Sequence, residues 1–330
     1  SMSKTMLTSF KNLANLINKE FNPKQILEIG SNDGSFIKNF PKRKVIGIEP
    51  CSNVEKITKK KGFKTYPLYW NSSTAKKLLN KEGKVDLIYS ANTISHIEDL
   101  NEVFKSINIL LNDDGVLIIE DPSLLECLKK NTYDQFYNEH IYVFSVIGIE
   151  SILKKYNLEI FDVQNLKIHG GSNRYFIKKK INKVPVNVNV KINRQKEINY
   201  GIKDISTYVK FAKRVKFSKK KLRKIFLELK NKKKNIIGYG VTAKSTTILN
   251  YCDIGKKFIS YFVDTTKDKQ NKYTPGMKIP IYKYPGFIEK NIDYIFLGAW
   301  NFKEEIFKKE KKFIKNGGKF IIHTPIPKII

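Results

Sequence analysis

The feature that most restricts the fold is a regular alternation of short apolar runs with stretches of helical spacing. The first half of the chain contains four such runs: QILEIG at 25–30, KVIGIEP at 44–50, VDLIYSAN at 85–92 and GVLIIED at 115–121. Runs that are apolar throughout are typical of strands buried on both faces, and strands that alternate with helices form parallel sheets covered by helices. We therefore predict an α/β fold for this part of the chain.

Two further patterns complete the expected organisation. LEIFDVQNL at 158–166 and NRYFIKKK at 173–180 flank a glycine-containing turn, which predicts an antiparallel hairpin. Apolar residues between 205 and 229 recur at steps of three, four or seven, which predicts a long amphipathic helical region broken near Ser218. From Asn235 the strand–helix alternation restarts with NIIGYG, FISYFVD, IDYIFLGAW and KFIIHTP. We therefore predict a first domain at 1–180, a helical connector at 181–234 and a smaller Rossmann-like α/β domain at 235–330.

Composition excludes several classes of protein. The chain has no apolar run of eighteen residues, so we expect no transmembrane helix and no membrane partner. Its three cysteines and four histidines are scattered, which predicts neither a disulfide framework nor a metal site, and we expect a cytoplasmic protein. The 62 basic against 31 acidic residues give a net charge of +31, which suits a polyanionic partner. Because the lysines are spread along the chain, we favour general lysine enrichment and consider nucleic acid an unlikely partner.

A glycine motif ends the first predicted strand. In LEIGSNDGSF, Gly30 and Gly34 allow a tight turn and a close approach of a ligand, and Glu28 lies where ligands bind in open α/β sheets. Glu49 ends the second strand, where a carboxylate can accept hydrogen bonds from two ribose hydroxyls. The spacing is G-x-x-x-G rather than the G-x-G-x-x-G of dinucleotide sites. With the acid on the next strand, it resembles the S-adenosylmethionine site of class I methyltransferases.

This resemblance implies a set of cofactor contacts at four strand ends. Tyr69, after the third strand, is a candidate to stack on adenine, and the SANTISHI loop after the fourth strand resembles the loop that lines the methionine moiety. The expected cofactor-binding residues are Glu28, Gly30, Asn32, Gly34, Glu49, Pro50, Tyr69 and Asn92.

The segment YDQFYNEH follows the fifth strand and joins proton-handling groups to aromatic neighbours. Free histidine titrates near neutrality, and His140 is the expected general base. Glu139 would raise its proton affinity and orient its ring, and Tyr137 can donate to a developing oxyanion. We therefore expect Tyr137, Glu139 and His140 to carry catalysis.

Several separated motifs together resemble one family, the sugar C-3 methyltransferases that act on nucleotide-linked keto-deoxysugars. The motifs are EIGSNDG, ANTISHI, EDP, YDQFYNEH, HGGSNRYF, GYGVTAKSTTILNYC, DTTKDKQNKYTPGMKIP and AWNFKEEI. The resemblance covers nearly all of 5–330. It implies a class I methyltransferase domain, S-adenosylmethionine as cofactor, and a nucleotide-diphosphate sugar as substrate. Among such sugars, a dTDP-sugar is the favoured one. It also implies proton removal beside a ketone and attack of the enolate on the methyl group.

The resemblance adds substrate contacts in two places. The first group lies in HGGSNRYF and comprises His169, Gly170, Ser172, Asn173 and Arg174. The second lies where GYGVTAKSTT repeats the strand–glycine–helix design, because amides at a helix start suit a diphosphate; it comprises Gly240, Lys244, Ser245 and Thr246. The motif lacks the G-K-[ST] spacing of a P-loop, so we do not expect ATP hydrolysis.

Members of the family usually begin with a cysteine-rich zinc-binding domain and a tyrosine-bearing segment. This sequence starts after both, so we expect no metal in it, and either trimming or natural absence would explain the difference. Three alternatives stay open at this point. They are an O- or N-methyltransferase on a similar sugar, a basic nucleic-acid-binding protein, and a non-catalytic scaffold that keeps the fold. SANT in place of [DNS]-P-P-[YF] after the fourth strand argues against methylation of nucleic-acid bases.

Overall fold

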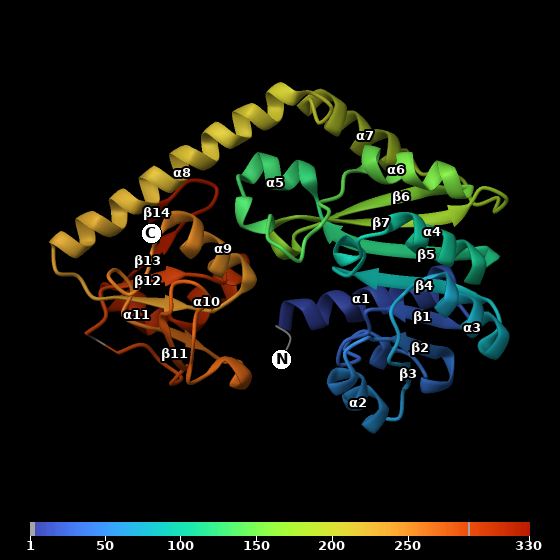
Figure 1. Cartoon of the computed structure of the whole chain (residues 1–330), viewed down its shortest axis with the longest axis horizontal. Coiled ribbons are helices and arrows are strands. Elements are labelled where there is room, and N and C mark those ends of the chain that lie inside the picture. The colour runs from blue at the N-terminus through green and yellow to red at the C-terminus, as the bar shows by residue number, and fades with distance from the viewer. Residues whose placement is uncertain (1–3, 290) are drawn as a thin grey trace. The chain divides into compact units, whose positions relative to one another are not determined.

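A computed structural model describes residues 4–289 and 291–330 as two compact units (Figure 1). The first unit takes in the chain up to Leu125 together with Glu139–Ile202, and the second takes in Glu126–Asn138 together with Lys203–Ile330. This division into compact units follows other bounds than the predicted ones after residues 180 and 234. The helical region is shared between the units, and a short internal segment of the first half belongs to the second unit.

The first unit is built around a seven-stranded sheet with strand order β3-β2-β1-β4-β5-β7-β6. Its elements are α1 (Lys4–Glu20), β1 (Ile26–Ile29), β2 (Val45–Ile48), α2 (Ser52–Lys60), β3 (Lys64–Tyr66), α3 (Ser72–Glu82), β4 (Val85–Ala91), α4 (Leu100–Leu110), β5 (Leu111–Pro122), α6 (Val146–Leu153), β6 (Leu158–Leu166), β7 (Ser172–Lys179) and α7 (Val188–Tyr200). The unit boundary passes through α5 (Leu124–Lys130).

The strands from β3 to β5 are parallel, and β7 runs antiparallel between β5 and β6. The parallel sheet and the β6–β7 hairpin confirm the strand predictions. Strand order reverses between β1 and β4, and ligands of open α/β sheets bind outside the carboxyl ends of the strands at such a point.

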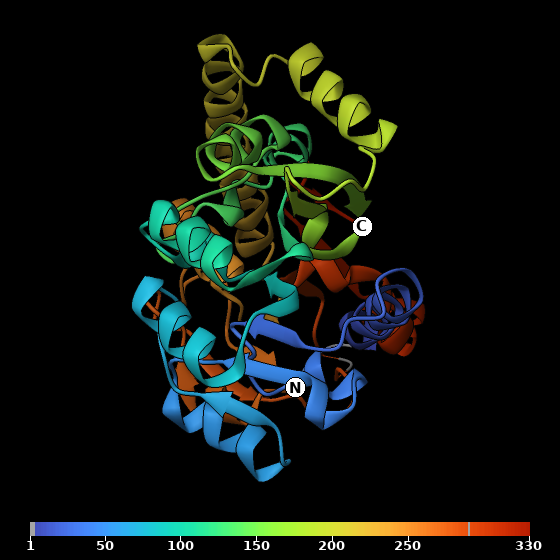
Figure 2. The same cartoon turned by 90° about the vertical axis from the view of Figure 1, so that its right-hand side faces the viewer.

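Helices cover both faces of this sheet. On one face α3 and α4 lie side by side, as the light-blue and cyan helices of Figure 2 show, and they pack Leu78 and Phe104 into one core with Ile88 of β4. On the other face the ring of Phe10 in α1 lies 6.4 Å from that of Tyr89. Because neighbouring strand residues point to opposite faces, Ile88 and Tyr89 separate these two layers.

Helix α7 belongs to the first unit rather than to a separate connector. Val190 lies in the same core as α3 and α4. Glu197 accepts hydrogen bonds from the backbone N–H groups of Val146 (2.8 Å) and Ile147 (3.0 Å) at the start of α6. These N–H groups have no partner within their own helix, so Glu197 satisfies donors that would otherwise be lost on burial.

The second unit contains a sheet of order β10-β11-β9-β8-β12-β13-β14, parallel except at its two outermost strands. Its elements are α8 (Ile205–Asn231), β8 (Ile236–Tyr239), α9 (Ala243–Cys252), β9 (Phe262–Asp264), β10 (Lys272–Tyr273), β11 (Pro280–Lys283), β12 (Tyr294–Leu297), α10 (Lys303–Lys309), α11 (Lys311–Lys315), β13 (Lys319–Ile322) and β14 (Lys328–Ile329). The expected second Rossmann-like unit is therefore present. Among the helices of the described residues, none is long and apolar enough to cross a membrane.

Helix α8 runs without interruption through Ser218, which corrects the predicted break at that residue. Leu222, Phe226 and Leu229 pack into one core with α9 and one face of the sheet. Ser218 is buried, and its hydroxyl lies 3.2 Å from the Tyr133 hydroxyl. A buried serine with a hydrogen-bond partner can remain inside a helix, whereas an unpartnered one would favour a break.

Candidate active site

The loops after β1 and β4 meet at the point where strand order reverses. Gly30 has φ +74°, and a Cβ added to it would lie 2.2 Å from Thr93 Oγ1, so only glycine fits there. Asn32 and Asn92 also have positive φ values, +46° and +51°. Non-glycine residues in this conformation carry strain and cluster at functional sites. The sequence therefore forms a tightly turned edge at the expected cofactor position.

Two acids flank this edge. Glu28 lies on β1, and burial raises its pKa well above the usual value. Its Oε2 is buried and has no hydrogen-bond partner among the described residues. Glu49 follows β2; its Oε2 accepts from Asn32 N (3.0 Å) and its Oε1 from Cys51 N (2.9 Å). Each carboxylate oxygen has two acceptor sites, so Glu49 is oriented by backbone and can still accept from a ligand.

The structure brings most of the expected cofactor residues to this edge. Gly34 turns the glycine loop with φ +76°, and Pro50 directly follows Glu49. Tyr69 is 75% exposed, whereas Trp70 is buried and donates to Val103 O, so Tyr69 is the aromatic available to a ligand. The remaining acceptor capacity of Glu49 and the unpartnered oxygen of Glu28 fit a nucleoside-containing cofactor with hydroxyl and amine donors. Among the described residues there is no cluster of histidine, cysteine, aspartate or glutamate that could hold a metal ion.

The Tyr-x-Glu-His motif is divided between the units. Tyr137 belongs to the second unit, and Glu139 and His140 belong to the first. The ring of His140 lies 5.1 Å from that of His96, at 38°. His96 ends the 3-10 turn Ile94–His96 that follows β4, and Tyr142 N donates to Ser95 O (3.2 Å). His140 is thus held at the loop after β4.

This histidine pair has a polar environment. Burial lowers the pKa of His96, and the negative charge of Glu139 acts in the opposite direction. The side chain of Ile141, the residue after His140, is 48% exposed within this unit. His96 and His140 therefore place two imidazole rings together at the loop after β4.

Sequence reasoning missed three residues of this group. His96 and Ser95 lie in ANTISHI and Asp121 in EDP, motifs that follow β4 and end β5. Ser95 Oγ donates to Asp121 Oδ1 at 2.6 Å. Burial raises the pKa of Asp121 to about 7, although the Ser95 hydrogen bond lowers it. Polar residues directly after two adjacent strands were the available signal, because such strand ends lie together.

The HGGSNRYF motif forms the turn after β6 and most of β7. His169 (φ +52°) and Gly170 (φ +88°) form the turn between β6 and β7. Arg174 lies on β7 opposite Glu120, is buried, and donates from Nε to Glu120 Oε1 at 2.7 Å. A buried arginine requires such a partner.

The neighbouring side chains of this motif are also engaged within the sheet. Asn173 accepts from Asn165 Nδ2 (2.8 Å) and donates to the Tyr175 hydroxyl (3.2 Å). Ser172 Oγ donates to Ile168 O at 3.3 Å. Asn173 and Arg174 therefore link β5, β6 and β7, and their expected role as substrate contacts stays a prediction.

The GYGVTAKSTT loop is closed by its own contacts. Ser245 is buried, and it forms a capping box with Thr242 at the start of α9. Val241 N donates to Asp264 Oδ2 (2.8 Å), and Thr242 N donates to Ser245 Oγ (2.8 Å). A Cβ at Gly240 would lie 2.7 Å from the Ala299 Cβ, so this glycine serves loop packing.

The Ser245 hydroxyl and two loop amides thus have partners within the loop, and the expected diphosphate role of Ser245 stays a prediction. Burial lowers the pKa of Lys244, and the charge of Asp134 opposes this shift, so Lys244 lies in the field of an acid of its own unit. Thr246 is half-buried in the first turn of α9.

Comparisons with known proteins agree with this geometry. A family model described as a methyltransferase domain matches residues 6–163, and one described as a C-methyltransferase C-terminal domain matches residues 167–327. The sheet order and these matches define a class I, Rossmann-like methyltransferase followed by a second Rossmann-like unit. The chain is 31% identical over 307 residues to the C-methyltransferase NovU of Streptomyces niveus, over 92% of this chain and 73% of that protein. It belongs to the C-methyltransferase family.

Solved methyltransferases resemble about half of the chain. One, an S-adenosylmethionine-dependent methyltransferase from Clostridium acetobutylicum, is 17% identical with a TM-score of 0.41, over 52% of this chain and 92% of that one. Another, magnesium protoporphyrin IX methyltransferase from Synechocystis with bound S-adenosylhomocysteine, is 14% identical with a TM-score of 0.40, over 53% and 83%. Likenesses at this level add nothing to the assignment of substrate.

Proposed function

We propose that this C-methyltransferase uses S-adenosylmethionine to methylate a nucleotide-linked keto-deoxysugar at a carbon next to its ketone. C-3 is the favoured position. The observation that carries the proposal is the place of His140. It lies against His96 at the loop after β4, in the same unit as the turned edge of Gly30 and Thr93. Transfer to carbon needs a base beside the methyl donor, whereas transfer to an amine does not.

Residues of the glycine edge would hold the cofactor. Glu49 is oriented to accept from ribose hydroxyls, Gly30 makes the tight turn after β1, and Tyr69 offers an exposed ring for the adenine. When bound, S-adenosylmethionine supplies a methyl group on a positively charged sulfur, which is open to attack by a carbanion-like carbon.

The remaining chemistry is assigned to residues of this chain. His140 removes the proton from the carbon beside the ketone, and the electron pair moves onto the carbonyl oxygen. Glu139 stabilises the protonated ring, and Tyr137 donates to the oxygen that gains charge. With the cofactor bound, the carbon would take the methyl group, the electron pair of the broken sulfur–methyl bond would stay on sulfur as the thioether of S-adenosylhomocysteine, and the carbonyl would re-form. His140 would be left with one proton to return to water.

The test is incubation of the protein with S-adenosylmethionine and a panel of nucleotide keto-sugars, dTDP-linked first. Mass spectrometry should find a gain of one methyl group, and NMR should place it on carbon. A methyl group on oxygen or nitrogen would replace the proposal by the corresponding methyltransferase. Absence of turnover with every nucleotide sugar, together with turnover of another ketone, would overturn the substrate class.

A further inference from the structure

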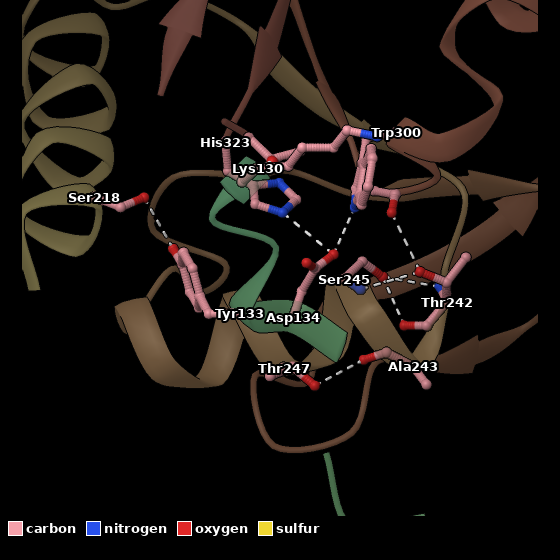
Figure 3. A network of polar contacts seen from close by, with 12 residues as sticks. Lys130, Tyr133, Asp134, Ser218, Thr242, Ala243, Ser245, Thr247, Trp300 and His323 are labelled. Atoms are coloured by element: carbon pink, nitrogen blue, oxygen red, sulfur yellow. Dashed lines mark hydrogen bonds and ion pairs between the residues drawn. The ribbon is translucent and has the colours of Figure 1, made fainter. Parts of the chain in front are cut away.

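The segment Glu126–Asn138 precedes the catalytic Glu139 and His140 in sequence and belongs to the second unit. Figure 3 shows part of it as the green ribbon among the brown elements of that unit. Its backbone is held at both Leu128 and Lys130: Leu128 O accepts from Arg214 (2.7 Å), and Lys130 O accepts from Thr324 Oγ1 (2.8 Å). The segment is therefore fastened to the second unit before the catalytic motif begins.

Asp134 makes the innermost attachment. It is fully buried, and its Oδ2 accepts from Trp300 Nε1 at 2.5 Å and lies 3.3 Å from His323 Nε2, as Figure 3 shows. Trp300 and His323 follow β12 and β13. The Asp134 charge also opposes the fall in the pKa of Lys244 caused by burial.

A buried carboxylate is retained only with such donors and positive groups around it. The segment thus occupies the carboxyl ends of β12 and β13, the edge at which open α/β sheets bind ligands. The second unit uses this edge to bind its own chain.

The attachment lies close to the catalytic motif along the chain. Tyr137 is the third residue after Asp134, and His140 is the sixth. An extended chain spans at most about 3.6 Å per residue, so Tyr137 stays within roughly 11 Å of the Asp134 backbone. Fixing Asp134 therefore limits where Tyr137 can move.

We propose that Asp134, held by Trp300 and His323, is a positioning residue that seats the catalytic segment, so that the second unit contributes to the chemical step. The kinetic part of this inference rests on the proposed function, because it takes Tyr137 and His140 as catalytic. Asp134 itself touches no substrate. Its loss should act through the segment, as misplacement of a catalytic group lowers the rate without removing the group.

The same unit offers a matched control. Glu310 is also buried, and it accepts from an aromatic donor, the Tyr284 hydroxyl, at 2.6 Å. Glu310 lies outside the segment, between α10 and α11. The pair Asp134→Asn and Trp300→Phe can therefore be compared with Glu310→Gln and Tyr284→Phe. In each pair, one variant replaces the buried carboxylate by an amide, and the other removes the aromatic hydrogen-bond donor.

Two measurements on the full chain test the inference. Hydrogen exchange followed by mass spectrometry should show faster exchange of amides 131–142 in Asp134→Asn and Trp300→Phe, and unchanged exchange there in the controls. Steady-state kinetics should show kcat lowered at least tenfold in the first pair with KM changed less than threefold. The controls should keep kcat within twofold, even where their melting temperatures fall equally.

The outcomes separate the two proposals. Unchanged exchange in the Asp134 pair would refute the anchor, whatever the substrate is. Faster exchange with unchanged kcat, or equal kcat losses in both pairs, would refute its role in positioning and leave His140 as base. Full activity of His140→Asn would instead refute the proposed base, and the exchange data would still decide whether Asp134 anchors the segment.

Discussion

At the scale of single residues, the histidine pair gives the site its chemical character. His140 lies with its ring 5.1 Å from that of His96, and Asp121 reaches the same loop through Ser95. Burial acts oppositely on the acid and the base: it lowers the pKa of His96 and raises that of Asp121. Both shifts favour neutral forms near pH 7, so the site keeps an uncharged imidazole beside the proposed base.

Replacement of His140 by asparagine should lower kcat about a hundredfold or more, the usual scale for loss of a general base. Asparagine keeps a hydrogen-bonding group and loses basicity. The wild-type protein should exchange deuterium at the reacting carbon with solvent, and His140→Asn should not. Binding of S-adenosylhomocysteine, measured by calorimetry, should remain unchanged. Exchange at the wild-type rate in the variant would assign the base elsewhere, with Glu139 next to be tested.

The raised pKa of Asp121 makes a prediction about stability. Its value of about 7 lies above the ordinary 3.8, so the folded chain keeps a proton that the unfolded chain loses. This contribution to stability is present below about pH 4 and is lost as the pH rises through about 7. Urea unfolding between pH 4.5 and 8 should show a decline in wild type, on the order of a few kcal/mol, that Asp121→Asn lacks.

Ser95→Ala provides the matched comparison for Asp121. It removes the hydrogen bond that lowers the Asp121 pKa. The decline in stability should then extend to higher pH than in wild type. Identical pH dependence in wild type and Asp121→Asn would show that Asp121 is already ionised in the folded protein.

At the scale of elements, helix α8 packs into the core of the second unit mainly through its C-terminal half. Phe226 is fully buried among aromatic rings, with Phe258 and Phe296 each 5.8 Å away between centroids. Phe217, in the same helix, is 58% exposed. The helix therefore depends on the packing of its C-terminal half for its place in the second unit.

Phe226→Ala should lower the free energy of unfolding of the second unit by about 3–5 kcal/mol, because it opens a cavity in a close-packed core. Phe217→Ala should change it by less than about 0.5 kcal/mol. Thermal and denaturant unfolding of the two variants would measure both effects. Equal losses would mean that the exposed half of α8 is as important for stability as its buried half.

Strands and helices were the part of this fold that local sequence could predict. Runs such as QILEIG and NIIGYG specify buried parallel strands because both of their faces must be apolar, and β1 and β8 lie there. The role of Arg174 could not be predicted. It depends on the register that puts β7 opposite Glu120, and a polar residue beside a glycine turn looks the same in sequence whether it binds a ligand or a neighbouring strand.

At the scale of the whole molecule, the chain is shared between its two units in a way that sequence order hides. The glycine edge and Glu49 were predictable because their spacing follows from the strand–turn–helix design. The attachment of Asp134 to His323 was not, because 189 positions separate the two residues and no local pattern links them. Contacts of this kind form only when distant strand ends meet, so they appear in the fold and not in the motifs.

The net charge of +31 is a property of the whole molecule with its own consequence. A strongly positive field raises the local concentration of anionic ligands, and salt screens it, with a Debye length of about 10 Å at 0.1 M. Many of the lysines lie on exposed faces rather than in one described cluster, so the field should act at long range and not through one contact.

Raising NaCl from about 0.05 to about 0.5 M should therefore raise the KM for a nucleotide-diphosphate sugar about three- to tenfold, because the substrate is anionic and exposed charges are screened. kcat should change less than twofold, since the bound substrate lies inside the site. S-adenosylhomocysteine, which has no net charge at neutral pH, is the control, and its Kd should also change less than twofold.

Binding of duplex RNA, measured over the same range of NaCl, tests the alternative of a nucleic-acid-binding protein. Two results together would favour a nucleic-acid partner over the sugar. RNA affinity would fall steeply with salt, as expected for release of several counterions, and the KM for the sugar would not change with salt.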